Sequence, residues 1–532
     1  MRQWSGSRLS LDYTFQHHKL AAYYAGDPAT PEAWREVIAR VQTQPRERDR
    51  MVAILQAQLE QRQAPEQARA AAAKLADPRT VAIVTGQQAG LFGGPLYTLM
   101  KGLTAARLAA DIETQFGVPC VTVFWNHAED HDWEEVASAW VLDADLQAHR
   151  LTVGGIEGDG HVPVGQVHLT DDITRVLADL DTLLPQTEFT ADTVAQLRRC
   201  YQPGTGMADA FGHLLDALLG PLGVVVFDGS DSAAKPLASA IFRRVLDHPG
   251  RTRQLASAAG EALVADGYHA QVLAQPDGTA LFSMVGGRIP IRYRDGQFFV
   301  GDTPVEAETL RADAEAHPEH FSPNVLLRAV VQDTLLPTIA YVAGPSELAY
   351  LGQLKSVYAF HETAMPLIVP RATGTILDSA SLRFLSRTSL ELRSLQAQDE
   401  HVLNHWLESQ LPPTLEQALH DLEHTMDERM GALLAAVPAL DPTLDGAVKS
   451  SQGRIAHELR GLHAKVITAA KRRHDTLRRQ FGHAQHLAFP GGHPQERVVC
   501  LAWFMNRFGP ALVPRLYECL PVEGGKHWLL QL

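Results

Sequence analysis

The stretch VAIVTGQQAGLFGG at residues 81–94 is the clearest indication of the fold, because a short apolar run passes directly into a glycine-rich loop. A run of β-branched and apolar residues that ends at glycine is typical of a strand buried on both faces. The segment from Pro95 through Tyr97 to Lys101 then predicts a helix. Glycines let a backbone approach a ligand closely, and a helix N-terminus offers N–H groups to phosphate or carboxylate. A tight turn with glycines for packing only is the alternative.

Four further apolar runs repeat this pattern, and each ends at Gly, Asn, Asp or Arg before a helix-like segment. They are Pro119–Trp125, Val224–Asp228, Thr338–Ala343 and Pro366–Pro370. Alternation of short buried strands with helices predicts the α/β class, with a parallel sheet covered by helices on both faces.

The segment between the third and fourth of these five runs has a different pattern. His269–Ala274, Ala280–Val285, Arg288–Tyr293 and Gln297–Val300 are separated by turn sequences that contain glycine, which predicts a small β-rich insertion of antiparallel hairpins. A helix is expected next, capped by Ser322 and begun by Pro323, with Asn324, Arg328 and Gln332 on neighbouring turns.

Two long amphipathic stretches follow Asp378, beyond which strand signals cease. Apolar residues recur at steps of three or four over 415–437 and again over 448–477, and Pro438 and Pro442 lie between the two stretches. This pattern predicts an antiparallel helical hairpin whose apolar seam needs a partner, either the hairpin itself or a second subunit.

These signals divide the chain into five segments. We expect the first part of the sheet core with N-terminal helices at 1–265, the connecting insertion at 266–335 and the second part of the core at 336–378. We expect the helical arm at 379–485 and a C-terminal segment packing back on the core at 486–532.

Composition limits the function. The 532 residues carry 47 Lys+Arg and 61 Asp+Glu, and the resulting charge of −14 disfavours attraction to nucleic acid or to an anionic membrane. The four cysteines are too sparse for a disulfide scaffold and predict reduced core thiols. Without a long apolar stretch, a cytoplasmic protein that binds small molecules is expected.

The residues after Pro119–Trp125 carry the acid–base chemistry. Titratable side chains are crowded at the carboxyl end of a buried strand, where open α/β sheets bind ligands. The candidate catalytic residues are His127, Glu129, Asp130, His131 and Asp132. A solvated acidic loop is the alternative. His127 and His131, four residues apart, can also share a metal on one helical face, although no H-E-x-x-H motif is present.

Other polar residues near the predicted strand ends are candidates for substrate binding. They are Gly86, Gln87, Gln88, Gly90, Gly94, Tyr97, Lys101, Asn126, Ser346, Glu347 and Arg371. Ser346 has a second interpretation as a helix cap, and Arg371 as a surface salt bridge.

Four motifs, in order along the chain, resemble those of the bacillithiol biosynthesis cysteine-adding enzymes, a family of cysteine ligases. They are TGQQAGL with GPLYT and Lys101; residues 119–125 with EDHD at 129–132; GPSELAY at 344–350 with Gln353-Leu354-Lys355 and Val369-Pro370-Arg371; and PGG at 490–492 with Gln495-Glu496-Arg497. The resemblance implies a Rossmann-like core with connecting insertions, a C-terminal coiled-coil arm and a homodimer.

The resemblance also implies a reaction, in which the carboxyl group of L-cysteine is joined to the amine of glucosaminyl malate to give bacillithiol. In this hypothesis N–H groups near Gly90 to Pro95, with Lys101 or Arg371, hold the malate carboxylates, and the acidic cluster deprotonates the amine. Amide formation needs an activated carboxyl, for which ATP is a natural source. The chain has no His-Ile-Gly-His or Lys-Met-Ser-Lys-Ser element and no nucleotide motif, so the cofactor stays unknown.

Two alternatives stay open. One is a metal-dependent hydrolase that uses His127 and His131 to activate water. The other is a non-catalytic dimer that binds nucleotide or nucleic acid through the basic residues Lys471, Arg472 and Arg473 of the arm.

Overall fold

Five strands form a parallel sheet in the computed structural model of the chain, which describes residues 7–154, 162–410, 413–473 and 475–532. The described chain divides into two compact units. One comprises the chain up to Ile376 with Gln495–Leu530 and Leu532, and the other comprises Leu377–Pro494 with Gln531.

The parallel sheet has the strand order β12-β11-β1-β2-β5. Its strands coincide closely with the five predicted runs, so the predicted α/β class is confirmed. They are β1 (Val81–Gln87), β2 (Cys120–Asn126), β5 (Val225–Asp228), β11 (Thr338–Ala343) and β12 (Leu367–Pro370). Gln87 pairs with Asn126, which pairs with Asp228, so the carboxyl ends of three strands lie side by side.

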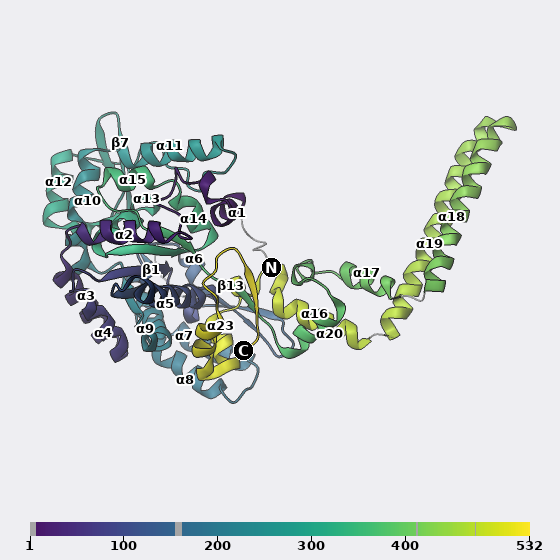
Figure 1. Cartoon of the computed structure of the whole chain (residues 1–532), viewed down its shortest axis with the longest axis horizontal. Coiled ribbons are helices and arrows are strands. Elements are labelled where there is room, and N and C mark those ends of the chain that lie inside the picture. The colour runs from purple at the N-terminus through teal and green to yellow at the C-terminus, as the bar shows by residue number, and fades with distance from the viewer. Residues whose placement is uncertain (1–6, 155–161, 411–412, 474) are drawn as a thin grey trace. The chain divides into compact units, whose positions relative to one another are not determined.

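Helices cover both faces of this sheet (Figure 1). Val81 and Ile83 of β1 point to one face and pack with α2 (Pro31–Thr43) and α5 (Tyr97–Phe116). Ala82 and Val84 point to the other face, as alternation along a strand requires, and belong to the same core as residues of α3, α4, α13, α14 and α15. Those helices are Arg48–Gln61, Glu66–Lys74, Val325–Leu335, Pro345–Leu351 and Lys355–Phe360.

The connecting insertion is an antiparallel sheet of five strands, in the order β10-β6-β7-β8-β9. Its bounds are β6 (Gly278–Ser283), β7 (Ile289–Arg294), β8 (Gln297–Val300), β9 (Thr303–Val305) and β10 (Phe321–Pro323). The predicted strand at His269–Ala274 is wrong, because this segment has no strand pairing.

The predicted helix cap in this region is also wrong. Ser322 and Pro323 belong to β10, and Asn324 caps α13 instead, because its Oδ1 accepts a hydrogen bond from the N–H of Leu326 at 3.0 Å. Asn is as good a cap as Ser, so the helix begins two residues later than predicted.

The remaining elements of the first unit surround these two sheets. The short sheets are β3 (Ser138–Leu142) with β4 (Ala148–Thr152), and β13 (Thr373–Ile376) with β14 (His527–Leu530). The helices are α1 (Arg8–Phe15), α6 (Trp133–Val136), α7 (Asp172–Leu183), α8 (Thr190–Cys200), α9 (Met207–Leu219), α10 (Ser239–Asp247), α11 (Arg251–Ala265), α12 (Ala307–Ala316), α21 (Gln495–Val498), α22 (Leu501–Phe508) and α23 (Leu512–Cys519). Cys120, Cys200 and Cys500 are buried and free, as predicted, whereas Cys519 is exposed.

The second unit contains the helical arm. Its helices are α16 (Ser379–Thr388), α17 (His401–Ser409), α18 (Pro413–Ala436), α19 (Asp445–Arg473) and α20 (Asp475–Ala488). The two longest, α18 and α19, lie side by side along their length, which confirms the predicted hairpin (Figure 1). The side chains of Lys471, Arg472 and Arg473, on which the nucleic-acid alternative depends, lie outside the described residues. Among the helices described, none has the length and apolar character needed to cross a membrane.

Candidate functional site

A cavity of about 420 Å³ opens at the carboxyl ends of β1 and β2, between the parallel sheet and the connecting insertion. This is the edge at which open α/β sheets bind ligands, and the volume lies within the ~300–1,000 Å³ range of small-molecule sites. We call it the first cavity. Its lining includes the predicted residues Gln87, Gln88, Tyr97, Lys101, His127, Glu129, Asp130, Ser346, Glu347 and Arg371. It also includes residues that were not predicted, among them Glu135, Arg288, Arg328 and Arg497.

Six predicted residues do not line this cavity. Gly90 and Gly94 line a neighbouring smaller one, and Asn126 is buried with its Nδ2 donating to the carbonyl of Ala208 at 3.1 Å. His131 lies beside Arg288, with 3.2 Å between its Nδ1 and the guanidinium, and Asp132 caps α6. The sixth residue, Gly86, lies under the cavity. A Cβ there would come within 2.4 Å of His127 Nε2, so glycine permits this close packing.

Lys101 lies in the cavity wall with all three of its N–H donors engaged. Its Nζ lies 2.8 Å from the carbonyl of Gly86, 3.2 Å from Gln87 Oε1 and 2.5 Å from Glu347 Oε2. Glu347 in turn accepts from the N–H of Gly344 at 2.7 Å, and Gly344 is the N-cap of α14. The interpretation of Ser346 as the cap is therefore wrong: Ser346 lies within the first turn and lines the cavity. An ammonium group satisfied in this way holds the wall together and has no donor left for a ligand.

Arg371 is likewise paired with a carboxylate. Its Nη2 lies 2.6 Å from Oε1 of Glu496, and both side chains are buried. The alternative interpretation of Arg371 as a surface salt bridge is therefore wrong, because the ion pair is buried. Its partner comes from α21, more than 100 positions away in the sequence. The pair connects the end of β12 to the C-terminal segment.

The acidic cluster is also largely paired. Glu129 forms a buried ion pair with Lys235. Asp130 accepts from Gln88 Nε2 at 2.9 Å and from Arg288 Nη1 at 3.2 Å. Burial lowers the pKa of His127 well below its usual range, helped by the cations Arg328 and Lys101. His127 is therefore neutral at neutral pH.

Arg328, on α13, is the cation best placed to bind an anionic ligand. Its guanidinium contacts His127 Nε2 at 3.2 Å, Gln332 Oε1 at 3.3 Å and Tyr350 Oη at 2.7 Å. Each of these three groups is uncharged, and no carboxylate among the described residues is paired with Arg328. The sequence placed Arg328 on a helix one turn after Asn324, but gave no sign that the connecting insertion turns this helix toward the sheet.

Glu135 is the carboxylate that the sequence prediction missed. It lies in α6 and lines the cavity, and no cation among the described residues lowers its pKa. Burial raises the pKa of Glu135, as do the neighbouring charges of Asp132 and Asp130, although a hydrogen bond from Gln88 opposes the shift. A carboxyl group with a raised pKa is suited to accept a proton near neutral pH.

The glycine-rich loop is occupied by the protein's own backbone. The N–H groups of Gly90, Gly93 and Gly94 donate to the carbonyls of Gln88, Gly90 and Leu91, respectively. The carbonyl of Gly94 accepts from the N–H of Leu501 at 2.9 Å, and the N–H of Leu96 donates to Val499. The loop thus binds the C-terminal segment of the same chain. Because the three N–H groups already donate to carbonyls of the loop, they are not available to hold a substrate carboxylate.

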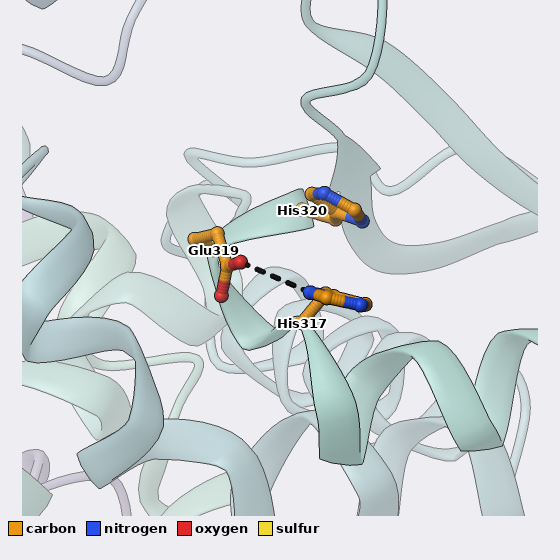
Figure 2. A group of neighbouring side chains, drawn as sticks. All are labelled: His317, Glu319 and His320. Carbon is orange, nitrogen blue, oxygen red and sulfur yellow. Dashed lines mark hydrogen bonds and ion pairs between the residues drawn. The ribbon is translucent and has the colours of Figure 1, made fainter.

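The structure gives no support to a metal shared by His127 and His131. Residues 127–132 form a loop between β2 and α6, so the spacing of four does not place the two rings on one helical face. Among the described residues, the metal-ligating side chains that come together are His317, Glu319 and His320, which lie outside the cavity (Figure 2). His317 Nδ1 lies 3.3 Å from Glu319, and His320 Nδ1 lies 3.0 Å from Asp313.

Comparison with known proteins gives matches along almost the whole chain. The family description "Bacillithiol biosynthesis BshC, N-terminal Rossmann-like domain" matches residues 2–372, and the C-terminal coiled-coil domain of the same family matches residues 374–532. The chain is similar to proteins named "Putative cysteine ligase BshC" from several bacteria. One from Salinibacter ruber is 35% identical over 98% of this chain and 95% of its own length. One from Koribacter versatilis is 31% identical over 96% of this chain and 95% of its own length.

The family matches confirm the resemblance that the four sequence motifs indicated. The Rossmann-like match contains the parallel sheet, and the coiled-coil match contains the helical arm together with Gln495–Leu530, which belong to the first unit. The chain therefore belongs to the BshC family of bacillithiol biosynthesis.

Proposed function

We propose that this protein is a cysteine ligase, which joins the carboxyl group of L-cysteine to the amine of glucosaminyl malate and so forms bacillithiol. The observation that carries the proposal is the pairing pattern in the first cavity. Arg328 has no carboxylate partner among the described residues, while Lys101 and Arg371 do. A cavity with a guanidinium that has no carboxylate partner among the described residues, beside several carboxylates, suits a ligand with an acidic end and an amine.

Arg328 binds the malate end in this proposal. A guanidinium binds a carboxylate through two parallel N–H···O bonds, and such bonds are stronger where water is excluded. The three uncharged partners of Arg328 orient the guanidinium without neutralising it. This assignment replaces the earlier hypothesis that Lys101, Arg371 and the glycine loop hold the malate.

Glu135 is the proposed base. The glucosamine nitrogen must lose a proton before it attacks the cysteine carboxyl carbon, and Glu135 is the cavity carboxylate with a raised pKa. The other candidates are less suitable because Glu129 is paired with Lys235, Asp130 with Arg288, and His127 Nε2 already faces Arg328. Glu135 takes this proton first; the free amine then forms the C–N bond as the C–O bond to the leaving group of the activated carboxyl breaks, and the second proton of the nitrogen is released to solvent.

The proposal is tested by incubating the purified protein with L-cysteine and glucosaminyl malate, with and without ATP and Mg²⁺, and measuring the product thiol by mass spectrometry. We expect bacillithiol from the wild type in at least one of these conditions and strongly reduced product from Arg328→Met. The control variant is Arg294→Met, which removes an arginine of the insertion sheet that does not line the cavity. Absence of product in both conditions, together with absence of glucosaminyl malate binding, would contradict the proposal.

A homodimer formed through the arm is a separate part of the proposal. Apolar residues that recur along α18 and α19 remain between 38% and 47% exposed, namely Leu415, Leu422, Leu433, Ile455 and Leu462. A row of half-exposed leucines along a helical hairpin supports an interface with a second copy. Light scattering after size exclusion should give twice the mass of one chain. The double variant Leu422→Glu/Leu462→Glu should give the mass of one chain. A monomeric wild type would contradict this assignment.

A further inference from the structure

A second, smaller cavity of about 230 Å³ lies against the first one. The two share five lining residues: Gln87, Gln88, Tyr97, Glu135 and Arg497. The smaller volume lies below the ~300 Å³ at which sites for drug-sized ligands begin, so it suits a smaller molecule. A reaction that joins two substrates needs two such adjoining spaces with a common boundary.

The second cavity is built by three segments that are distant in the sequence. The C-terminal segment lies between the glycine loop and β3, and the N–H of Cys500 donates to the carbonyl of Trp140 at 2.9 Å. On its other side, the N–H of Leu501 donates to Gly94. Gly90 and Gly94 of the glycine-rich loop therefore form part of the wall of this cavity.

The lining of the second cavity has one apolar and one polar part. The apolar part contains Val136, Ala139, Val498 and Cys500. Burial raises the pKa of Cys500 to about 11, so its thiol stays uncharged. The polar part includes Ser138 and the wall shared with the first cavity, where Arg497 and Glu135 contribute one charge of each sign.

We propose that the second cavity is the binding site for the cysteine substrate, with the short thiol side chain against the apolar part and the carboxyl group at Arg497 on the shared wall. This inference rests on the proposed function. It places the cysteine carboxyl group at the boundary with the first cavity, where the amine of glucosaminyl malate and the carboxylate of Glu135 also lie. The two substrates then enter from separate spaces and meet at the shared wall.

Two valines make a matched test. Val498 lines only the second cavity and Val325 lines only the first, so Val→Phe at each position fills one space without removing a polar group. Binding of L-cysteine and of glucosaminyl malate is measured by isothermal titration calorimetry on the full chain under reducing conditions. We expect Val498→Phe to weaken cysteine binding about tenfold or more and to leave glucosaminyl malate binding within about twofold. Val325→Phe should do the reverse.

Retained glucosaminyl malate binding shows that Val498→Phe is folded. If that variant does not fold, Ser138→Leu, which also lines only the second cavity, takes its place. Any of three results would overturn the inference. These are wild-type cysteine affinity in Val498→Phe, equal loss of cysteine binding in both variants, and no cysteine binding by the wild type. The expected binding pattern without any product formation would instead leave this site standing and contradict the proposed function.

Discussion

Nη2 of Arg371 lies 2.6 Å from Oε1 of Glu496, and both side chains are buried. The second oxygen of Glu496 accepts from Nη1 of Arg371 at 3.1 Å and from the N–H of Gly374 at 3.0 Å. This bidentate pair fixes the start of the C-terminal segment to the sheet core. The next residues of that segment, Arg497 and Val498, line the cavities, so the pair fixes their position.

The first prediction concerns this pair. Arg371→Met should lower the free energy of unfolding by about 3–5 kcal/mol, because it leaves the Glu496 carboxylate buried without its charge partner. The double variant Arg371→Met/Glu496→Leu should recover a large part of the loss, since it removes the unpaired charge. Urea denaturation of the four proteins measures this. A double variant as unstable as the sum of the two single variants would show that the two residues do not act as a pair.

The second prediction concerns recognition of the malate end. Arg328→Met should weaken glucosaminyl malate binding about 10- to 100-fold, because it removes charge-assisted hydrogen bonds. Arg328→Lys should restore only part of the affinity, since an ammonium group cannot reproduce the two parallel bonds. Calorimetric titration measures both, with Arg294→Met as the control. Unchanged affinity in Arg328→Met would show that another group binds the acidic end of the substrate.

The third prediction concerns the base. A base must be unprotonated to act, so kcat/KM should fall as pH is lowered through the pKa of Glu135, which burial and the charges of Asp132 and Asp130 raise above 4.5. Glu135→Gln should lower kcat about 10²- to 10⁴-fold and abolish this acid limb. Glu134→Gln, a change in the adjacent residue, should keep both the rate and the limb. If the acid limb survives in Glu135→Gln, a group other than Glu135 causes the fall in kcat/KM at low pH.

The fourth prediction concerns the close packing beneath the first cavity. Gly86→Ala should cost about 1–3 kcal/mol of stability and displace His127, because the new Cβ would lie 2.4 Å from Nε2 of that ring and 2.6 Å from the carbonyl of Trp125. Gly154→Ala is the matched change, since the nearest contact of its Cβ among the described residues would be Asp172, at 3.6 Å. Thermal unfolding of the two variants distinguishes them. Equal melting temperatures would contradict the packing that the structure shows.

Much of the fold could be predicted because buried parallel strands are written in the sequence as short apolar runs. Residues 81–84 of β1 and 339–343 of β11 are such runs, and the predictions match both strands to within two residues. Short strands without such a run were missed. Phe321–Pro323 contains a serine and a proline and resembles a helix start, and it becomes a strand because it pairs with Gly278–Ser283. That pairing is a tertiary contact, which local propensity does not contain.

The candidate site could be predicted in its location but less well in its pairings. The polar residues after β1 and β2 lie at one cavity because parallel strands end at the same edge of a sheet. Which cations are already neutralised depends on contacts between distant segments, such as Lys101 with Glu347. Glu135 was overlooked for the same reason, since its raised pKa arises from burial in the folded chain.

The central claim is that the first cavity binds glucosaminyl malate between Arg328 and Glu135. A crystal structure of the protein with glucosaminyl malate tests it most directly. We expect a malate carboxylate within hydrogen-bonding distance of the Arg328 guanidinium, and the amine facing Glu135 at the wall shared with the second cavity. Density for the ligand outside this cavity, or with its carboxylates turned away from Arg328, would contradict the claim.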